Sequence, residues 1–149
     1  MPSKRFRQTV AEVPTEAPPP VVVDASVWVA RYLIHDDFHA RSAAWFRMQR
    51  RAGRVFVAPT LLLPELAGSV ARVLNDTTLG LRAARSVRQL HHVQFVPLDA
   101  ALAAQTFQIA AQLRLRGAHA VYAALARRLS LQLVSWDKEQ IARAGAVEP

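Results

Sequence analysis

The feature that most constrains the fold is a short β-branched run that ends in an acid, VVVD at positions 21–24. A continuous apolar run of this kind is typical of a parallel strand that is covered by helices on both faces. Comparable short apolar runs predict three further strands, at 54–58, 94–98 and 131–135. The sequence therefore predicts an α/β protein with a mostly parallel sheet.

Amphipathic patterns between these strands predict the helices. Ser26 is placed to cap the first helix, and Gly53 is expected to end the second. Asp99 is placed to cap a long helix that Gly117 then breaks. Helices are expected at 61–74, 79–90, 99–115 and 119–129, followed by a short final one. Strands that alternate with helices imply a three-layer α/β/α sandwich around a central sheet of four to five strands.

Length and composition indicate one domain with a short tail. Prolines at positions 2, 14 and 18–20 predict a flexible or extended tail over residues 1–20, which leaves 21–149 as the folded domain. The chain has no cysteine, which excludes disulfides and thiolate metal sites and fits a cytoplasmic location. No apolar run approaches the roughly 20 residues of a membrane span, so no membrane partner is expected.

Three acids stand where an α/β sheet places its ligands. Asp24 and Asp137 directly follow predicted strands, and Glu65 lies one turn into the helix after the second strand. Ligands of open α/β sheets bind beyond the carboxyl ends of the strands. Carboxylates gathered there repel one another unless a divalent cation neutralises them. The sequence therefore predicts a divalent-metal site. Asp24 could instead cap the helix that follows it, and the charge of Glu65 could instead interact favourably with the dipole of its helix.

The charge balance suggests an acidic partner. The chain has 19 Lys+Arg against 11 Asp+Glu, for a net charge of +8, and nearly all of its basic residues are arginine. The planar guanidinium group matches phosphate oxygens in pairs. This balance favours nucleic acid or an acidic protein as partner, and an arginine-rich genome would explain it equally well.

Four segments together resemble the PIN-domain family, and among its members the VapC toxins of bacterial toxin–antitoxin pairs. They are VVVDASVWVA from position 21, LPELAGSV from 63, LRGAHAVYAALARRL from 115 and LVSWDKEQ from 133. The resemblance covers roughly residues 21–148. Each motif is short, and their order, spacing and strand–helix context give the resemblance its specificity.

This resemblance implies a metal-dependent endoribonuclease that uses Mg²⁺ or Mn²⁺ and acts on tRNA or rRNA. It also implies a homodimer and a small VapB-like antitoxin that inhibits it. The first, second and fourth acids of the family fall on Asp24, Glu65 and Asp137. Two small polar residues, Ser26 and Ser135, match positions that support the first and the last acid.

The third acid of the family is replaced by His119. Imidazole is never anionic, and Mg²⁺ prefers oxygen ligands, whereas Mn²⁺ or Zn²⁺ accepts nitrogen more readily. Three interpretations remain open. His119 could be a ligand or proton-transfer group in an altered active site, it could have abolished catalysis while RNA or antitoxin binding remained, or it could be structural.

Three further residues are candidates for binding substrate. Arg114 and Arg116 lie just before His119, where they could contact the phosphate backbone. Trp136 lies beside Asp137 and could stack on a base. Other tryptophans, in apolar segments, are more typical of a core.

Overall fold

The computed structural model describes residues 16–149. Most of the predicted tail, residues 1–15, therefore lies outside the described residues. Residues 16–20 carry no helix or strand and lead directly into the first strand. This short segment is held against the domain by Arg54, whose Nη1 donates to the carbonyl oxygen of Pro19 at 2.9 Å.

A four-stranded parallel sheet forms the centre of the molecule. Its order is β3-β2-β1-β4, and every neighbouring pair is parallel. Val22 of the central strand lies opposite Val57 on one side and Leu133 on the other. The strands are β1 (Val21–Val23), β2 (Phe56–Pro59), β3 (Val93–Val96) and β4 (Gln132–Val134). The predicted parallel sheet is confirmed, with the lower of the two expected strand numbers.

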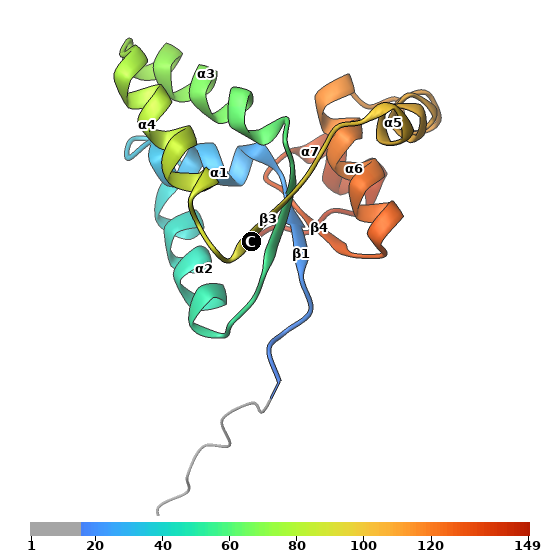
Figure 1. Cartoon of the computed structure of the whole chain (residues 1–149), viewed down its shortest axis with the longest axis horizontal. Coiled ribbons are helices and arrows are strands. Elements are labelled where there is room, and N and C mark those ends of the chain that lie inside the picture. The colour runs from blue at the N-terminus through green and yellow to red at the C-terminus, as the bar shows by residue number, and fades with distance from the viewer. Residues whose placement is uncertain (1–15) are drawn as a thin grey trace, which may run out of the picture.

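Helices cover both faces of this sheet, as Figure 1 shows. On one side lie α1 (Ala25–Tyr32), α2 (His39–Arg51), α3 (Leu62–Leu74) and α4 (Thr77–Arg88). On the other lie α5 (Ala100–Leu113), α6 (Gly117–Leu129) and α7 (Lys138–Ala144). The predicted three-layer sandwich is confirmed. Over residues 16–149, the apolar helices are all too short to cross a membrane.

The core explains why the central strand is continuously apolar. All three residues of β1 are buried, because α6 packs on one face and α1 covers the other. An aromatic cluster of Trp28, Trp45, Phe46 and Phe56 fills the layer between α1, α2 and the sheet, with the rings of Trp28 and Phe46 4.3 Å apart. Trp28 is therefore a core residue, as the sequence suggested, and Trp45 is partly buried against the core.

The residue that caps α1 is Asp24, and the prediction for Ser26 was wrong. An N-cap residue needs an extended backbone, and Asp24 is the last extended residue before the helix, at φ −66° and ψ 153°. Its side chain accepts from the backbone N–H of Ser26 at 3.0 Å. Asp99 caps α5 as predicted, with Oδ1 accepting from the N–H of Leu102 at 2.8 Å.

The break between α5 and α6 also differs from the prediction. Arg114 ends α5 by adopting a left-handed conformation, with φ 52°, and its N–H bonds to the carbonyl of Ala110. Gly117 does not break that helix but is the first residue of α6. The break therefore comes three residues earlier than the glycine suggested.

Candidate active site

Asp24 lies at the junction of β1 and α1, where a fixed set of donors holds its carboxylate. The residue is 1% exposed. Oδ2 accepts from the N–H of Ser26 at 3.0 Å and from Ser135 Oγ at 3.3 Å, and Oδ1 accepts from Gln140 Nε2 at 2.9 Å. A carboxylate offers about four lone-pair sites, so roughly one remains for a further partner.

The two serines tie the segment after β4 to Asp24. Ser135 Oγ, which donates to Asp24, also accepts from the N–H of Asp137 at 2.9 Å. Ser26 Oγ accepts from the N–H of Trp136 at 3.1 Å. The structure thus brings both predicted supporting residues into contact with the acids or their backbone.

Glu65 lies in the first turn of α3 and is paired with a buried phenol. Its Oε2 accepts from the hydroxyl of Tyr122 at 2.6 Å. Burial raises the pKa of Glu65, the charge of Asp24 adds to this, and the Tyr122 hydrogen bond and His119 oppose it. Burial and the charge of Glu65 in turn raise the pKa of Tyr122, so the phenol stays protonated and donates.

We expect Glu65→Gln to raise the melting temperature at pH 7. An acid whose folded-state pKa is raised stabilises the fold below its unfolded pKa and loses that contribution as the pH rises through the folded pKa. At pH 7, above the unfolded pKa of the carboxyl, Glu65 therefore lowers the free energy of unfolding, and glutamine removes this cost while still accepting from Tyr122. A change of about 1 kcal/mol moves Tm by roughly 2–4 °C in a domain of this size. Thermal unfolding by circular dichroism between pH 4 and pH 8 measures this.

The matched control is Glu139→Gln, which removes a carboxylate from the first turn of α7. Glu139 Oε1 lies 3.8 Å from Arg143 Nη1, so its loss should leave Tm unchanged or lower it slightly. A Glu65→Gln variant that melts below the wild type at pH 7 would contradict a raised pKa at Glu65.

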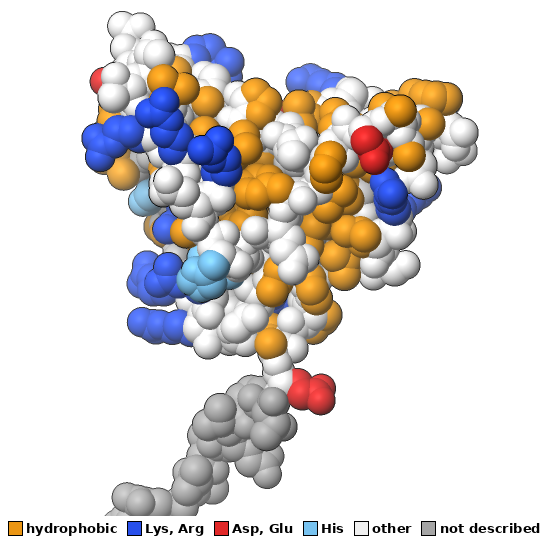
Figure 2. Space-filling model, viewed as in Figure 1, with side chains coloured by type: hydrophobic (Ala, Val, Ile, Leu, Met, Phe, Trp, Pro, Cys, Tyr) orange, Lys and Arg blue, Asp and Glu red, His pale blue; other side chains and the backbone are white. Residues whose placement is uncertain are grey.

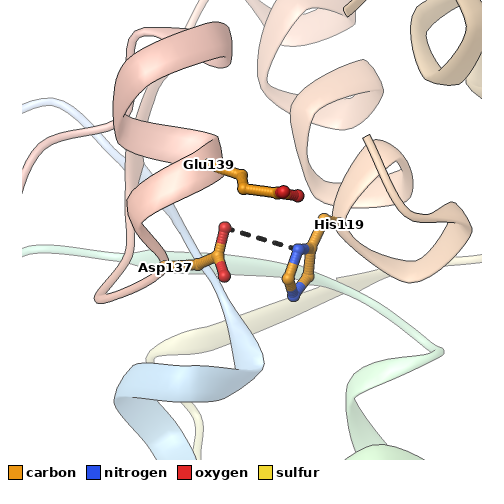
Figure 3. Close-up of side chains that lie close together, drawn as sticks. All are labelled: His119, Asp137 and Glu139. Atoms are coloured by element: carbon orange, nitrogen blue, oxygen red, sulfur yellow. Dashed lines mark ion pairs between the residues drawn. The ribbon is translucent and has the colours of Figure 1, made fainter. Parts of the chain in front are cut away.

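His119 faces the acids of α7 across a short gap. Figure 3 shows Glu139 of α7 and Asp137, the N-cap residue of α7, beside the imidazole of His119 on α6. His119 Nδ1 lies 3.4 Å from Asp137 Oδ1, and this buried nitrogen makes no hydrogen bond to any of residues 16–149. Among residues 16–149, these three side chains offer potential ligand atoms that all lie within 4.8 Å of one another.

A cleft of about 420 Å³ brings the predicted residues together. It is lined by Asp24, Glu65, Ser26 and His119, with Arg72 of α3 among the other lining residues. Asp137 adjoins this cleft through its contact with His119 and through Ser135. The side chains that the sequence assigned to chemistry therefore meet at the carboxyl edge of the sheet.

The donor set fits a divalent cation that accepts both oxygen and nitrogen. Asp24 and Glu65 each keep an oxygen lone pair beyond their hydrogen bonds, and His119 has a buried ring nitrogen without a partner. Carboxylates suit Mg²⁺ and Mn²⁺, and an added imidazole favours Mn²⁺. The residues present therefore fit a divalent metal ion.

Trp136 does not have the exposed ring that base stacking requires, and this prediction was wrong. The residue is 7% exposed. Its ring stacks on Phe38 at 4.3 Å, its Nε1 donates to Ser42 Oγ at 2.8 Å, and the guanidinium of Arg41 lies 4.5 Å from the ring centre. The indole fixes the segment between β4 and α7 and is not available to substrate.

The predicted substrate arginines are exposed but do not line the cleft. Arg114 forms the end of α5, where its carbonyl accepts from Arg143, and Arg116 is the N-cap residue of α6. Among residues 16–149, Arg72 is the arginine that lines the cleft, and its position in the sequence had not marked it as a candidate. Arg72 lies seven residues after Glu65, so both side chains lie on one face of α3. Helical periodicity could therefore have identified Arg72 from the sequence.

Two buried partners of the acids were also missed. Tyr122 lies three residues after His119 on α6, and Gln140 lies three residues after Asp137 on α7. Both spacings put a polar side chain within one helical turn of a predicted site residue. Gln140 is fully buried, which is uncommon for glutamine and reflects its bond to Asp24.

The comparisons with known proteins agree with this architecture. No curated protein matches the sequence. Among solved structures, VapC20 of Mycobacterium tuberculosis, described as a sarcin-ricin loop cleaving toxin, is 21% identical. The match covers 87% of this chain and 98% of that chain, with a TM-score of 0.73.

Two further structures share the fold. PAE2754 of Pyrobaculum aerophilum is 20% identical over 89% of this chain and 84% of that chain, with a TM-score of 0.62. FitAcB of Neisseria gonorrhoeae is 20% identical over 86% of this chain and 95% of that chain, with a TM-score of 0.60. Likenesses at these identities show the fold alone.

The match to a family model extends over most of the chain. The model of the PIN domain matches residues 21–146, a range that includes every acid of the cleft and all four strands. The sheet order, the helices on both faces and the acids at the carboxyl edge are consistent with that match. The chain belongs to the PIN-domain family.

Proposed function

We propose that this protein is a metal-dependent endoribonuclease that acts in the cytoplasm as a VapC-type toxin. The observation that carries the proposal is the cleft in which Asp24, Glu65 and His119 meet, with Asp137 beside the imidazole. Acids at the carboxyl edge of a parallel sheet are suited to phosphodiester hydrolysis when a cation joins them. The PIN-domain fold and the net charge of +8 support an RNA substrate.

Each side chain has a role that follows from its contacts. Asp24, Glu65 and Asp137 would hold a cation, and Ser26, Ser135 and Gln140 keep the carboxylate of Asp24 in one orientation. A bound Mg²⁺ or Mn²⁺ would lower the pKa of a water molecule and neutralise charge on the scissile phosphate.

Two residues would act on the substrate side of the cleft. His119, beside Asp137, is placed to contribute a nitrogen ligand or to transfer a proton. Arg72 lines the same cleft and is placed to pair with a phosphate of the strand. Arg114 and Arg116 remain candidates for contacts with more distant phosphates, because both are exposed.

The proposed partners are an RNA of the tRNA or rRNA class, a VapB-like antitoxin and a second copy of the chain. VapC20 is described as cleaving the sarcin-ricin loop, and other structures of this fold are toxin–antitoxin complexes. A homodimer is supported by a group of exposed apolar side chains at the junction of α3 and α4, namely Val73, Leu74, Leu79 and Leu81.

The purified protein is expected to cleave RNA more strongly with Mn²⁺ than with Mg²⁺, by roughly tenfold. The reason is the imidazole of His119, which Mg²⁺ accepts poorly. Gel analysis of total RNA, with each metal and with a chelator, measures this. Equal cleavage in the chelator would contradict metal dependence, and no cleavage with either metal would contradict the nuclease.

A second candidate function is a PIN domain that binds RNA or antitoxin without cleaving. The observation that favours it is the histidine at the position of the third acid. This candidate predicts that RNA binds with comparable affinity to the wild type and to an Asp24→Asn variant, while neither cleaves it with Mn²⁺. Filter binding beside the cleavage assay separates the two functions.

A further inference from the structure

We propose that a second cavity, separate from the acidic cleft, binds the phosphate group of a phosphate monoester. The cavity has a volume of about 210 Å³, far above the roughly 10–15 Å³ that a single water needs. It is lined by Phe56, the first residue of β2, and by His92, which directly precedes β3. It therefore lies at the amino edge of the sheet, and Asp24 lies at the opposite, carboxyl edge.

Three arginines from two helices converge on this cavity. Arg31 comes from α1, and Arg47 and Arg50 come from α2. No acid of residues 16–149 lines this cavity, and these arginines take part in none of the ion pairs found in that part of the chain. Figure 2 shows Lys and Arg side chains gathered along the side of the molecule formed by α2 and α4, with His side chains between them.

Helix dipoles explain only part of this arrangement. Arg31 and Arg50 lie in the last turns of α1 and α2, where a cation is favourable on any helix. The dipole accounts for one charge on each helix. It does not account for the convergence of the charges on one cavity, or for Arg47, which lies a turn before the end of α2.

Within the part of the chain that the structure describes, two buried polar atoms of the lining residues have no hydrogen-bond partner. Trp28 is 1% exposed, and its indole N–H makes no hydrogen bond. His92 Nδ1 is also buried and unpaired. Burial lowers the pKa of His92, and the nearby charges of His91, Arg50 and Arg31 lower it further. A bound anion would offset these charges and give the donors an acceptor, which makes the walls complementary to negative charge.

The number and kind of donors favour phosphate over carboxylate. Three guanidinium groups and an indole N–H offer more donors than the two oxygens of a carboxylate can accept, whereas a phosphate monoester presents three charged or strongly polar oxygens. The aromatic wall of Trp28, Phe46 and Phe56 then suits the organic body that a monoester carries. A free nucleotide and the 5′-phosphate end of an RNA strand share this chemistry.

The test follows the indole N–H resonances of the full-length protein by NMR, with a chelator present so that no metal site contributes. The probes are inorganic phosphate and adenosine 5′-monophosphate, and adenosine is the control. The resonance of Trp28 is expected to move with both phosphate probes and to stay fixed with adenosine. The resonance of Trp136 should stay fixed throughout, because its N–H is already bonded to Ser42.

A charge-matched pair of variants separates a built site from general electrostatics. Arg50→Gln is expected to weaken the binding of adenosine 5′-monophosphate by roughly tenfold, as the loss of a charge-assisted hydrogen bond predicts. Arg51→Gln, one residue along α2 and outside the cavity, should change it by less than about twofold. Equal weakening in both variants would overturn the proposal.

Two further measurements identify the molecule that carries the phosphate and test whether an acidic peptide binds instead. Tighter binding of a 5′-phosphorylated oligoribonucleotide than of the nucleotide supports the site and identifies an RNA end, and equal binding supports it and identifies a free nucleotide. The proposal is overturned if the Trp28 resonance does not shift with either phosphate probe. It is also overturned if the resonance shifts with a glutamate-rich peptide and with no phosphate probe. None of these results depends on RNA cleavage, so they test this site independently of the proposed nuclease activity.

Discussion

Asp24→Asn is expected to abolish metal-dependent cleavage, by at least about a hundredfold, and to leave the fold nearly as stable as the wild type. The amide cannot supply the negative charge that the cation needs. It can still accept from Ser26 and Ser135 with its oxygen. Its new N–H₂ group would face Gln140, whose Oε1 makes no hydrogen bond among residues 16–149. A flip of the Gln140 amide lets Oε1 accept from the new group and leaves Nε2 as the unpaired atom in place of Oε1, so the number of unpaired amide atoms of Gln140 is unchanged.

Asp24→Ala is expected to lose both activity and stability. It removes the cap of α1, at a cost of about 0.5–2 kcal/mol, and it leaves the buried donors of Ser135 and Gln140 unpaired, at about 1–3 kcal/mol each. Urea unfolding and RNA cleavage measured on the same preparations separate the two effects.

The matched control is Asp99→Asn, the equivalent change at the cap of α5. Asp99 lies outside the acidic cleft, so cleavage should remain within about twofold of the wild type. If Asp24→Asn retains full activity, the metal site proposed here is wrong. If it unfolds while Asp99→Asn does not, the amide exchange at Gln140 is wrong.

His119→Asp is expected to increase Mg²⁺-supported cleavage by at least about tenfold and to make stability depend on metal. The change places a third carboxylate beside Asp137 and Glu139, whose oxygens already lie within 4.8 Å of the imidazole nitrogen. Without metal their repulsion should lower Tm, and Mg²⁺ should restore it, because oxygen is the ligand that this ion prefers. Cleavage rates and Tm, each with Mg²⁺, Mn²⁺ and a chelator, measure both effects.

His119→Asn is the control, because it has the same size as aspartate and adds no charge. It should lack both the gain with Mg²⁺ and the loss of Tm in the chelator. If His119→Asp and His119→Asn both cleave as the wild type does with each metal, the residue contributes no ligand and its role is structural. If both variants lose Mn²⁺-supported cleavage, the imidazole itself takes part in the reaction.

The layers of the fold follow from local sequence. Apolar residues recur with the period of a strand or of a helix wherever one face of that element is buried, and a buried parallel strand such as β1 is apolar throughout. These patterns can be read from the sequence alone. The four strands and the helices on both faces were therefore predictable. The ends of the elements were less so. Arg114 ends α5 in a left-handed conformation, which glycine adopts more readily than arginine. The packing of α5 against α6 outweighs this local backbone preference.

The sequence indicated only some of the residues of the candidate site. The place of Asp24 and Asp137 at the carboxyl edge was predictable, because acids directly after strands converge on one edge of a parallel sheet. Glu65 reaches the same edge from the first turn of α3. Trp136 was misassigned because adjacency to Asp137 says nothing about exposure. Its indole packs on Phe38 and bonds to Ser42, which lie about a hundred residues away along the chain.

What the sequence by itself determined is thus the parallel sheet, the position of its acids and the histidine that replaces the third one. Tertiary structure alone decided which side chains those acids meet. Tyr122 donates to Glu65 and Gln140 donates to Asp24 because α6 and α7 return to the edge where β1 and β2 end. Such pairings depend on the approach of elements remote in sequence, which local propensity and periodicity do not encode.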